Sequence, residues 1–296
     1  MNFILDILKG MVMGIANVIP GVSGGTMAVS MGIYDKLITA LTHLLKDFKK
    51  SFKILLPLGI GMLVGILGLA RVIEWLFGVV PVQTNLLFIG LIVGGLPMII
   101  KEVKGKKFKI AYIIGFLAFF FLVTGLALLN GVKGADADLS FSIITEIKLF
   151  IVGMIAAATM VIPGVSGSMM LMLMGYYEPV ISTLNSTVDA LKAQDMAGLA
   201  AGFGVIIPFG LGIVVGIVAI AKLIEYLFAK FSAVVYWCII GLITASPIAI
   251  VIMNKEIFAE INAVTVITAV LAFAIGCVIA YFLGGDVKKD SEKVSE

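Results

Sequence analysis

A chain of 296 residues with 61% hydrophobic and only 13% charged residues, and a mean hydropathy of +1.18, is too apolar for a soluble globular domain. Its net charge of +3 gives no indication of nucleic-acid binding, and we use the lysines and arginines as markers of membrane topology instead. The composition therefore predicts a polytopic membrane protein.

Uncharged stretches divide the chain, and each is near or above the about 18–20 residues that cross a bilayer as a helix. In chain order they are 10–34, 54–70, 75–100, 110–132, 149–177, 196–221, 231–254 and 261–285. Lys9 lies ahead of the first stretch, and no small-residue cleavage pattern accompanies it, so we expect no removable signal peptide.

Residues that bind metals or form disulfides are scarce. Cys238 and Cys277 lie inside apolar stretches, which predicts two buried thiols rather than a disulfide. His43 is the only histidine, and the sequence has no His/Cys/Asp cluster with the spacing of a metal site. We expect no metal and no cofactor.

One motif occurs twice, as IPGVSGG at 19–25 and IPGVSGS at 162–168. Each copy interrupts an uncharged run in which an unbroken helix would otherwise be expected. Proline removes a backbone donor and the small residues lower helix propensity, so each copy should split its run into two half-helices. The freed N–H groups find no acceptor in lipid and must face protein, water or a ligand.

The similarity extends well beyond the motif. Residues 19–41 align with 162–184, residues 54–77 with 205–228, and residues 89–92 with 240–243. The second block pairs Pro57 with Pro208 and Glu74 with Glu225. This pattern indicates that the chain arose by duplication.

The positive residues indicate how the two halves are oriented. If each motif segment enters the membrane and returns to the same side, three full crossings remain per half and the halves are inverted. The cytoplasmic face then receives all of the 21 lysines and arginines except Arg71, Lys133, Lys148, Lys192 and Lys255. Complete crossing by the motif segments would give parallel halves and a more even division of charge, so we favour the inverted arrangement.

The expected fold is an all-α polytopic integral membrane protein with two inverted-topology repeats. Repeat 1 spans 1–132, with a re-entrant hairpin at about 3–45 and crossings at about 54–77, 86–100 and 110–130. Repeat 2 spans 133–285, with a hairpin at about 147–192 and crossings at about 199–228, 233–253 and 262–284. Residues 286–296 form a polar tail, and both termini are expected in the cytoplasm.

The motif turns are candidate anion sites, because a Gly/Ser turn before a helix presents N–H groups, hydroxyls and the positive end of the helix dipole. The residues expected to hold a phosphate or carboxylate are Gly21, Ser23, Gly24, Gly25 and Thr26 in the first copy and Gly164, Ser166, Gly167 and Ser168 in the second. Each serine could equally be a helix N-cap that is satisfied within its own turn.

Two cation–carboxylate pairs lie in apolar segments, Arg71 with Glu74 and Lys222 with Glu225. The spacing of three places both members of a pair on one helix face. The cations could hold the substrate anion while Glu74, Glu225 or Asn17 serves ion coupling. Alternatively, the pairs lie at the membrane interface beside Trp75 and Tyr226.

The motif segments NVIPGVSGGTMA (17–28) and VIPGVSGSMMLMLMGYYEPV (161–180), with the Pro57 and Pro208 segments, resemble the bacterial polyprenyl-phosphate transporter (PopT-like) family, formerly a family of unknown function. The resemblance covers about Leu5 to Gly285. It implies a flippase of the bacterial cell membrane that returns undecaprenyl phosphate from the outer to the cytoplasmic leaflet, for reuse in peptidoglycan and other wall polymers.

In that family the first motif often carries an acidic residue where this chain has Asn17, so a coupling carboxylate would lie elsewhere, at Glu74 or Glu225. The coupling ion, a proton or sodium, and the oligomeric state stay open at this point.

Other functions stay open from the sequence. A membrane undecaprenyl-pyrophosphate phosphatase also resembles an inverted repeat with Pro-Gly-x-Ser turns, but hydrolysis needs a cation and an acid or base near the turn. No arginine or histidine follows Ser23 or Ser166 in either turn, so we expect a transporter and no enzyme. A transporter of a small anion, a passive channel or a membrane scaffold with packing kinks are further alternatives.

Overall fold

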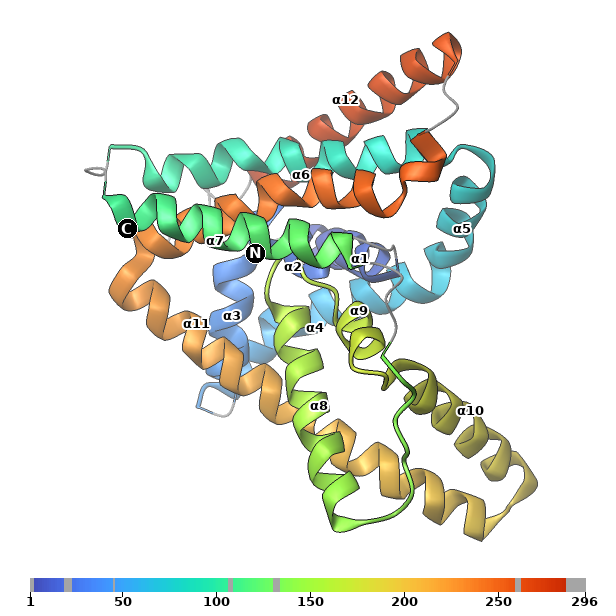
Figure 1. Cartoon of the computed structure of the whole chain (residues 1–296). Helices are drawn as coiled ribbons and strands as arrows, with labels where there is room; N and C mark the ends of the chain where they lie inside the picture. The colour runs from blue at the N-terminus through green and yellow to red at the C-terminus, as the bar shows by residue number, and fades with distance from the viewer. Residues whose placement is uncertain are drawn as a thin grey trace. The chain divides into compact units, whose positions relative to one another are not determined.

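The computed structural model describes residues 3–18, 23–44, 46–105, 109–129, 134–258 and 262–285, and the regular structure of these residues is entirely helical (Figure 1). The elements are α1 (Phe3–Val18), α2 (Gly24–Ser30), α3 (Tyr34–Thr42), α4 (Phe48–Val64), a π-helical segment (Gly65–Leu69), α5 (Ala70–Val79), α6 (Pro81–Val103), α7 (Ile110–Leu128), α8 (Ile143–Val161), α9 (Gly167–Leu173), α10 (Tyr177–Ala193), α11 (Met196–Met253), a 3₁₀ turn (Lys255–Phe258) and α12 (Ala263–Gly285).

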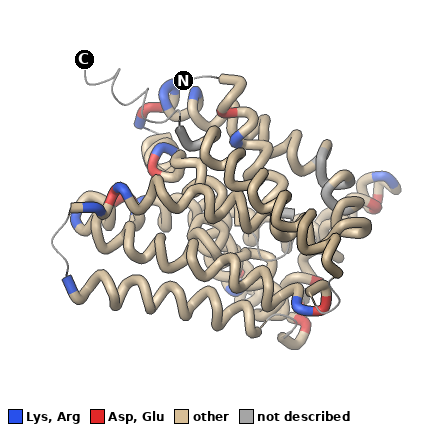
Figure 2. Tube along the Cα trace, turned by 90° about the horizontal axis from the view of Figure 1, so that it is seen from above, with Lys and Arg blue, Asp and Glu red and all other residues tan. Residues whose placement is uncertain are grey.

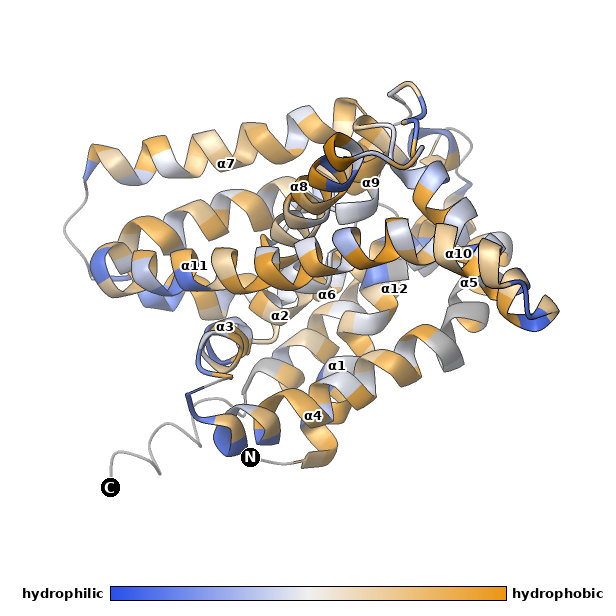
Figure 3. Ribbon diagram, turned by 90° about the horizontal axis from the view of Figure 1, so that it is seen from below, coloured by the Kyte–Doolittle hydropathy of each residue, from blue (hydrophilic) through white to orange (hydrophobic). Residues whose placement is uncertain are grey.

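Among the described residues, five helices are long and apolar enough to cross a membrane: α6, α7, α8, α11 and α12. Figure 2 shows that the charged residues lie mainly near helix ends. The bodies of the helices are largely hydrophobic in Figure 3, where hydrophilic residues concentrate on α3 and at helix ends. A multi-pass helical membrane protein, as the composition predicts, is the fold that the structure supports.

Both motif copies interrupt their helices as predicted. The first apolar run forms α1 up to Val18 and resumes as α2 at Gly24, and the second forms α8 up to Val161 and resumes as α9 at Gly167. Helix α11 covers two of the predicted crossings, about 199–228 and 233–253, and consists of two helices that meet at a kink, where Phe231 has non-helical dihedral angles.

The described helices belong to two compact units. Unit 1 comprises Met1–Leu128, Ile162–Val165 and Lys222–Glu296, and unit 2 comprises Leu129–Val161 and Ser166–Ala221. The start of the second motif, residues 162–165, thus belongs to the same unit as the first motif. Helix α11 contributes residues to both units.

One close helix crossing is repeated in the two units. In unit 1, α1 packs on α4 so tightly that a Cβ added to a glycine on either helix would overlap the backbone carbonyl of the other. In unit 2, α8 packs on α11 in the same way. The glycines are Gly10, Gly61 and Gly65 in unit 1 and Gly153, Gly212 and Gly216 in unit 2. Small residues at such crossings let two backbones approach closely in a membrane.

The partners in the two crossings correspond in the sequence alignment. Gly61 faces the carbonyl of Ile7, and its counterpart Gly212 faces that of Phe150. Gly65 and Gly216 likewise face Met11 and Met154. The duplication is therefore visible as a repeated pair of packed helices as well as a repeated sequence.

The remaining helices of unit 1 pair across the two halves of the sequence. Helix α6 packs along α12, where Gly90 meets the carbonyl of Phe273. The second part of α11 packs on α7, where Gly241, the counterpart of Gly90, meets the carbonyl of Phe116. Each half therefore supplies a helix that packs against the last helix of the other half, which ties the two halves together in unit 1.

Candidate functional site

Nearby side chains accept the hydrogen bonds of the first N–H groups of α2 at the first motif turn. Ser23 is the N-cap of α2, in an extended conformation, and its Oγ accepts a hydrogen bond from the Gly25 N–H at 3.2 Å. The Oδ1 of Asn17, near the end of α1, accepts the Gly24 N–H at 3.0 Å. Two of the N–H groups that a helix start leaves unpaired are thus satisfied locally. The predicted ligand Gly21 lies outside the described residues.

The second turn is built differently. Ser166 is the N-cap of α9 and makes no side-chain capping bond, and its hydroxyl instead lies 2.8 Å from that of Ser168. Met160 stands where the first copy has Asn17, and its Cγ would lie 2.6 Å from a Cβ added at Gly167. A thioether is only a weak hydrogen-bond acceptor. Among the described side chains, none is seen to replace the Asn17 contact in this copy.

One direct bond joins the two motif copies inside unit 1. The N–H of Gly164 donates to Oγ1 of Thr26 at 2.7 Å. Thr26 is 1% exposed, and Gly164 has a φ of 80°, a left-handed conformation that favours glycine. A Cβ at Gly164 would lie 3.1 Å from Val123 and 3.4 Å from the Ser246 hydroxyl, so the turn is also tightly enclosed. Thr26 therefore holds the second turn through its side chain.

The predicted charged residues lie on α5 and α11. Arg71 and Glu74 belong to α5, and their side chains lie outside the described set. Lys222 is exposed. Glu225 pairs with His43, whose Nδ1 lies 3.3 Å from Glu225 Oε1. The structure thus gives Glu225 a partner on the segment after α3, which the spacing of Lys222 and Glu225 did not indicate.

Asp35 is a polar residue that we did not single out from the sequence. Its Oδ2 accepts a hydrogen bond from the Tyr236 hydroxyl at 2.9 Å. One side of Asp35 is open to solvent, but the surrounding protein removes enough water to raise the pKa of its carboxyl; the Tyr236 bond opposes this change and Glu102 adds to it. A signal was available, since the repeat alignment places Asp35 opposite another carboxylate, Glu178.

Two buried polar residues were also missed. Lys9 on α1 is 3% exposed, although the sequence places it just before an apolar stretch. Asn85 on α6 is 1% exposed; its Nδ2 donates to the carbonyl of Pro81, while its Oδ1 has no hydrogen-bond partner in the described structure. Burial of this kind is set by tertiary packing and leaves no local pattern in a uniformly apolar sequence.

The part of the chain that the structure describes holds no group of three or more His, Cys, Asp or Glu side chains placed to bind a metal ion. The arrangement offers hydroxyls, backbone N–H groups and a few ionisable side chains. Such groups can bind an anion and exchange a proton.

Comparison with known proteins identifies the family. Residues 13–266 match the family described as undecaprenyl phosphate translocase-like. A polyprenyl-phosphate transporter of Staphylococcus aureus is 30% identical over 290 residues, covering 95% of both chains. A polyprenyl-phosphate transporter of Vibrio cholerae is 28% identical over 257 residues, covering 82% of this chain and 75% of that protein. No solved structure matches the chain. The chain belongs to the undecaprenyl phosphate translocase-like family.

Proposed function

We propose that this member of the translocase-like family carries undecaprenyl phosphate from the outer to the cytoplasmic leaflet of the bacterial cell membrane, so that the lipid is reused in wall-polymer synthesis. The relatives named as polyprenyl-phosphate transporters support the lipid class. The observation in the structure that carries the proposal is the Thr26–Gly164 bond, because it brings the two Pro-Gly-Val-Ser-Gly motifs into contact.

The proposed architecture is a pair of inverted repeats at 1–132 and 133–285, each with a re-entrant hairpin, at about 3–45 and 147–192. The repeated glycine crossings and the helix interruption at each motif support this arrangement. Inverted repeats with broken helices are a recurring plan of secondary transporters, in which the two halves exchange conformations around a central site. Both termini would then lie in the cytoplasm, as the positive residues indicate.

The phosphate of the lipid is proposed to bind at the motif turns. Its ligands would come from the residues predicted from the sequence: Gly21, Ser23, Gly24, Gly25, Thr26, Gly164, Ser166, Gly167 and Ser168, with Arg71 and Lys222 as cations. In this scheme Thr26 acts mainly by holding Gly164 in place, since its hydroxyl already accepts that N–H. Phosphate oxygens are strong acceptors and suit a group of backbone N–H donors and hydroxyls.

Transport is proposed to be coupled to an ion, a proton or sodium. The candidates are Glu74, Glu225 and Asn17. Glu225 gains support from its contact with His43, because a carboxylate beside an imidazole can exchange a proton within the pair. Asn17 stays neutral and caps Gly24, so any role in coupling would be through a coordinated cation.

Reconstitution tests the function directly. Purified protein in liposomes should move fluorescent undecaprenyl phosphate between leaflets, and should release no inorganic phosphate from undecaprenyl pyrophosphate. Phosphate release without lipid movement would instead establish the phosphatase, and uptake of a small anion without lipid movement would establish an anion transporter. Arg71→Ala should abolish lipid movement, whereas near-normal rates would assign Arg71 to the membrane interface.

A further inference from the structure

The two helices of α11 meet at Phe231, and a phenylalanine does not itself favour a break in a helix. Phe231 has φ −133° and ψ 37°, outside the helical region, at the kink where the two helices of α11 meet. Sharp kinks usually occur at proline, glycine pairs or π-bulges. In the first half the aligned residue is Val80, which has φ −134° and ψ 60° and separates α5 from α6, directly before Pro81. Both halves therefore break at the same position, but Phe231 has no proline after it.

Two polar contacts from the α3 segment reach α11 on either side of Phe231. His43 lies 3.3 Å from Glu225, before the break, and Asp35 accepts the hydroxyl of Tyr236 at 2.9 Å, after it. All of these residues belong to unit 1.

The spacing of these contacts fits a bent helix. Eight residues of helix, from Asp35 to His43, cover about 12 Å, whereas an unbroken helix from Glu225 to Tyr236 would cover about 16 Å. A bend between Glu225 and Tyr236 brings these two residues closer together, so that their separation approaches that of Asp35 and His43. Figure 1 shows α3 beside the orange part of α11.

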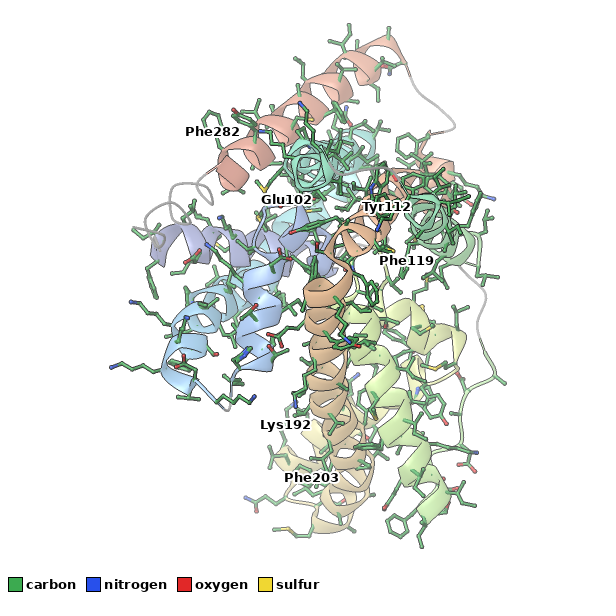
Figure 4. The ribbon with its side chains drawn as sticks, turned by 90° about the vertical axis from the view of Figure 1, so that its left-hand side faces the viewer. Glu102, Tyr112, Phe119, Lys192, Phe203 and Phe282 are labelled. Carbon is green, nitrogen blue, oxygen red and sulfur yellow. The ribbon has the colours of Figure 1, made fainter. Side chains whose placement is uncertain are left out.

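Aromatic packing across the break depends on the same tyrosine. The ring of Phe228, before the break, meets that of Tyr236, after it, edge to face with centroids 5.3 Å apart. The Tyr236 hydroxyl is therefore fixed by Asp35 while its ring is fixed by Phe228. Glu102, near the end of α6 and labelled in Figure 4, adds negative charge close enough to Asp35 to raise the pKa of its carboxyl.

The segment that makes these contacts is joined firmly to the first motif. Helix α2 turns into α3 through Gly32, with φ 67°, and the Ile33 N–H bonds back to the carbonyl of Ala28 at 2.9 Å. Helix α2 also carries Thr26, which holds Gly164 of the second motif. A continuous set of bonded contacts thus runs from the motif turns through α3 to the break in α11.

We propose that α3 is a brace, in which Asp35 and His43 hold α11 bent at Phe231 through Tyr236 and Glu225 and transmit the position of the motif turns to α11. The four side chains have a positioning role in this proposal, since they act on the bend, and Glu225 is in addition an ion-coupling candidate of the proposed function. The part of this proposal that concerns transport rests on the proposed function; the part that concerns the bend does not.

The bend can be measured independently of transport. Spin labels at Leu223 and Ile248, both exposed and on opposite sides of Phe231, would be about 37 Å apart on a straight helix, within the range of pulsed electron spin resonance. Cys238 and Cys277 are first replaced by alanine so that only the labels react. Tyr236→Phe removes one hydroxyl and Asp35→Asn removes one charge. The control is Tyr226→Phe, which makes the same hydroxyl deletion on the same helix, at an exposed ring for which the described residues show no hydrogen bond to α3.

We expect Tyr236→Phe and Asp35→Asn to lengthen or broaden the distance distribution by several ångströms and to slow lipid movement at least threefold, while Tyr226→Phe changes neither. His43→Gln should act in the same direction and add to Tyr236→Phe, because it breaks the second contact. Unchanged distances in Tyr236→Phe and His43→Gln together would overturn the brace. Changed distances with wild-type rates of lipid movement would confirm the bend and overturn its link to the motif turns. Changed distances in a protein whose wild-type form moves no lipid would support the brace and refute the proposed function instead.

Discussion

The glycine crossings give the sharpest test of the duplicated fold, because the chain contains its own controls. Gly61 and Gly212 occupy equivalent positions, and an added Cβ at either would overlap a backbone carbonyl of the partner helix. Gly59 and Gly210, two residues earlier, are also equivalent to each other, and nothing lies within 4 Å of a Cβ added there. Alanine substitution at all four positions therefore compares, in each repeat, a glycine packed against a partner backbone with a glycine on the same helix that has free space around it.

The structure sets the expected size of the difference. At Gly61 the obstacles include the Ile7 carbonyl and the Met11 nitrogen, which are backbone atoms that no rotamer change can move. Forcing extra atoms into a packed contact costs about 1–3 kcal/mol. Replacing a glycine within a helix by alanine returns about 0.5–1 kcal/mol. Gly61→Ala and Gly212→Ala should therefore lose up to about 2 kcal/mol, while Gly59→Ala and Gly210→Ala gain up to about 1 kcal/mol.

Thermal unfolding in detergent, followed by the fluorescence of Trp75 and Trp237, measures these changes. One kcal/mol corresponds to roughly 2–4 °C for a domain of moderate size. Equal stability of Gly61→Ala and Gly59→Ala would refute the close approach of α1 and α4. A loss for Gly61→Ala without a loss for Gly212→Ala would refute the equivalence of the two crossings.

Three further outcomes follow from the site. Thr26→Val should cost about 1–3 kcal/mol, because it leaves the half-buried Gly164 N–H without its acceptor, while Thr26→Ser should retain most of the stability; equal unfolding temperatures for the two variants would contradict this. Ser23→Ala should cost about 1 kcal/mol, because it removes the acceptor of the Gly25 N–H. Ser166→Ala should leave stability nearly unchanged yet slow lipid movement, because Ser166 makes no side-chain capping bond; a lower unfolding temperature for Ser166→Ala than for Ser23→Ala would contradict this. Because burial raises the pKa of the Asp35 carboxyl in the folded state, the wild-type unfolding temperature should fall relative to that of Asp35→Asn as pH rises above about 4, the ordinary pKa of an aspartate, and should level off once pH exceeds the raised folded pKa; a difference that stays constant with pH would exclude this effect.

The sequence predicted features that depend on local chemistry. Proline followed by small residues predicted the interruptions at both motifs, and the helices end at Val18 and Val161 and resume at Gly24 and Gly167. Hydropathy predicted a multi-pass helical protein, and five helices of the described residues meet that criterion. The carboxylates and cations of α5 and α11 were visible because charges are rare in these segments.

Features that depend on packing were not predictable in the same way. The bond between Asp35 and Tyr236 joins residues 201 positions apart. The break at Phe231 lies between the crossings expected at about 199–228 and 233–253, but neither glycine nor proline marks its exact residue. The uniformly apolar sequence around Lys9 and Asn85 gives no sign of which face of each helix is buried. The glycine crossings were present in the alignment as matched glycines, but only the paired backbones reveal which of them are in contact.

The two motif copies, although nearly identical in sequence, differ in their contacts, and this bears on how a duplicated protein can transport in one direction. The first copy satisfies Gly24 with Asn17 and Gly25 with Ser23, while the second has Met160 in place of Asn17 and an uncapped α9. Two strictly equivalent turns would bind an anion equally well from either side of the membrane. Because the first turn must release its own side chains before an anion can take those N–H groups, the two copies differ in free energy of binding. Such a difference cannot by itself drive net transport, since equilibrium is set by the gradients, but under the proposed function it would determine which turn the lipid phosphate occupies more.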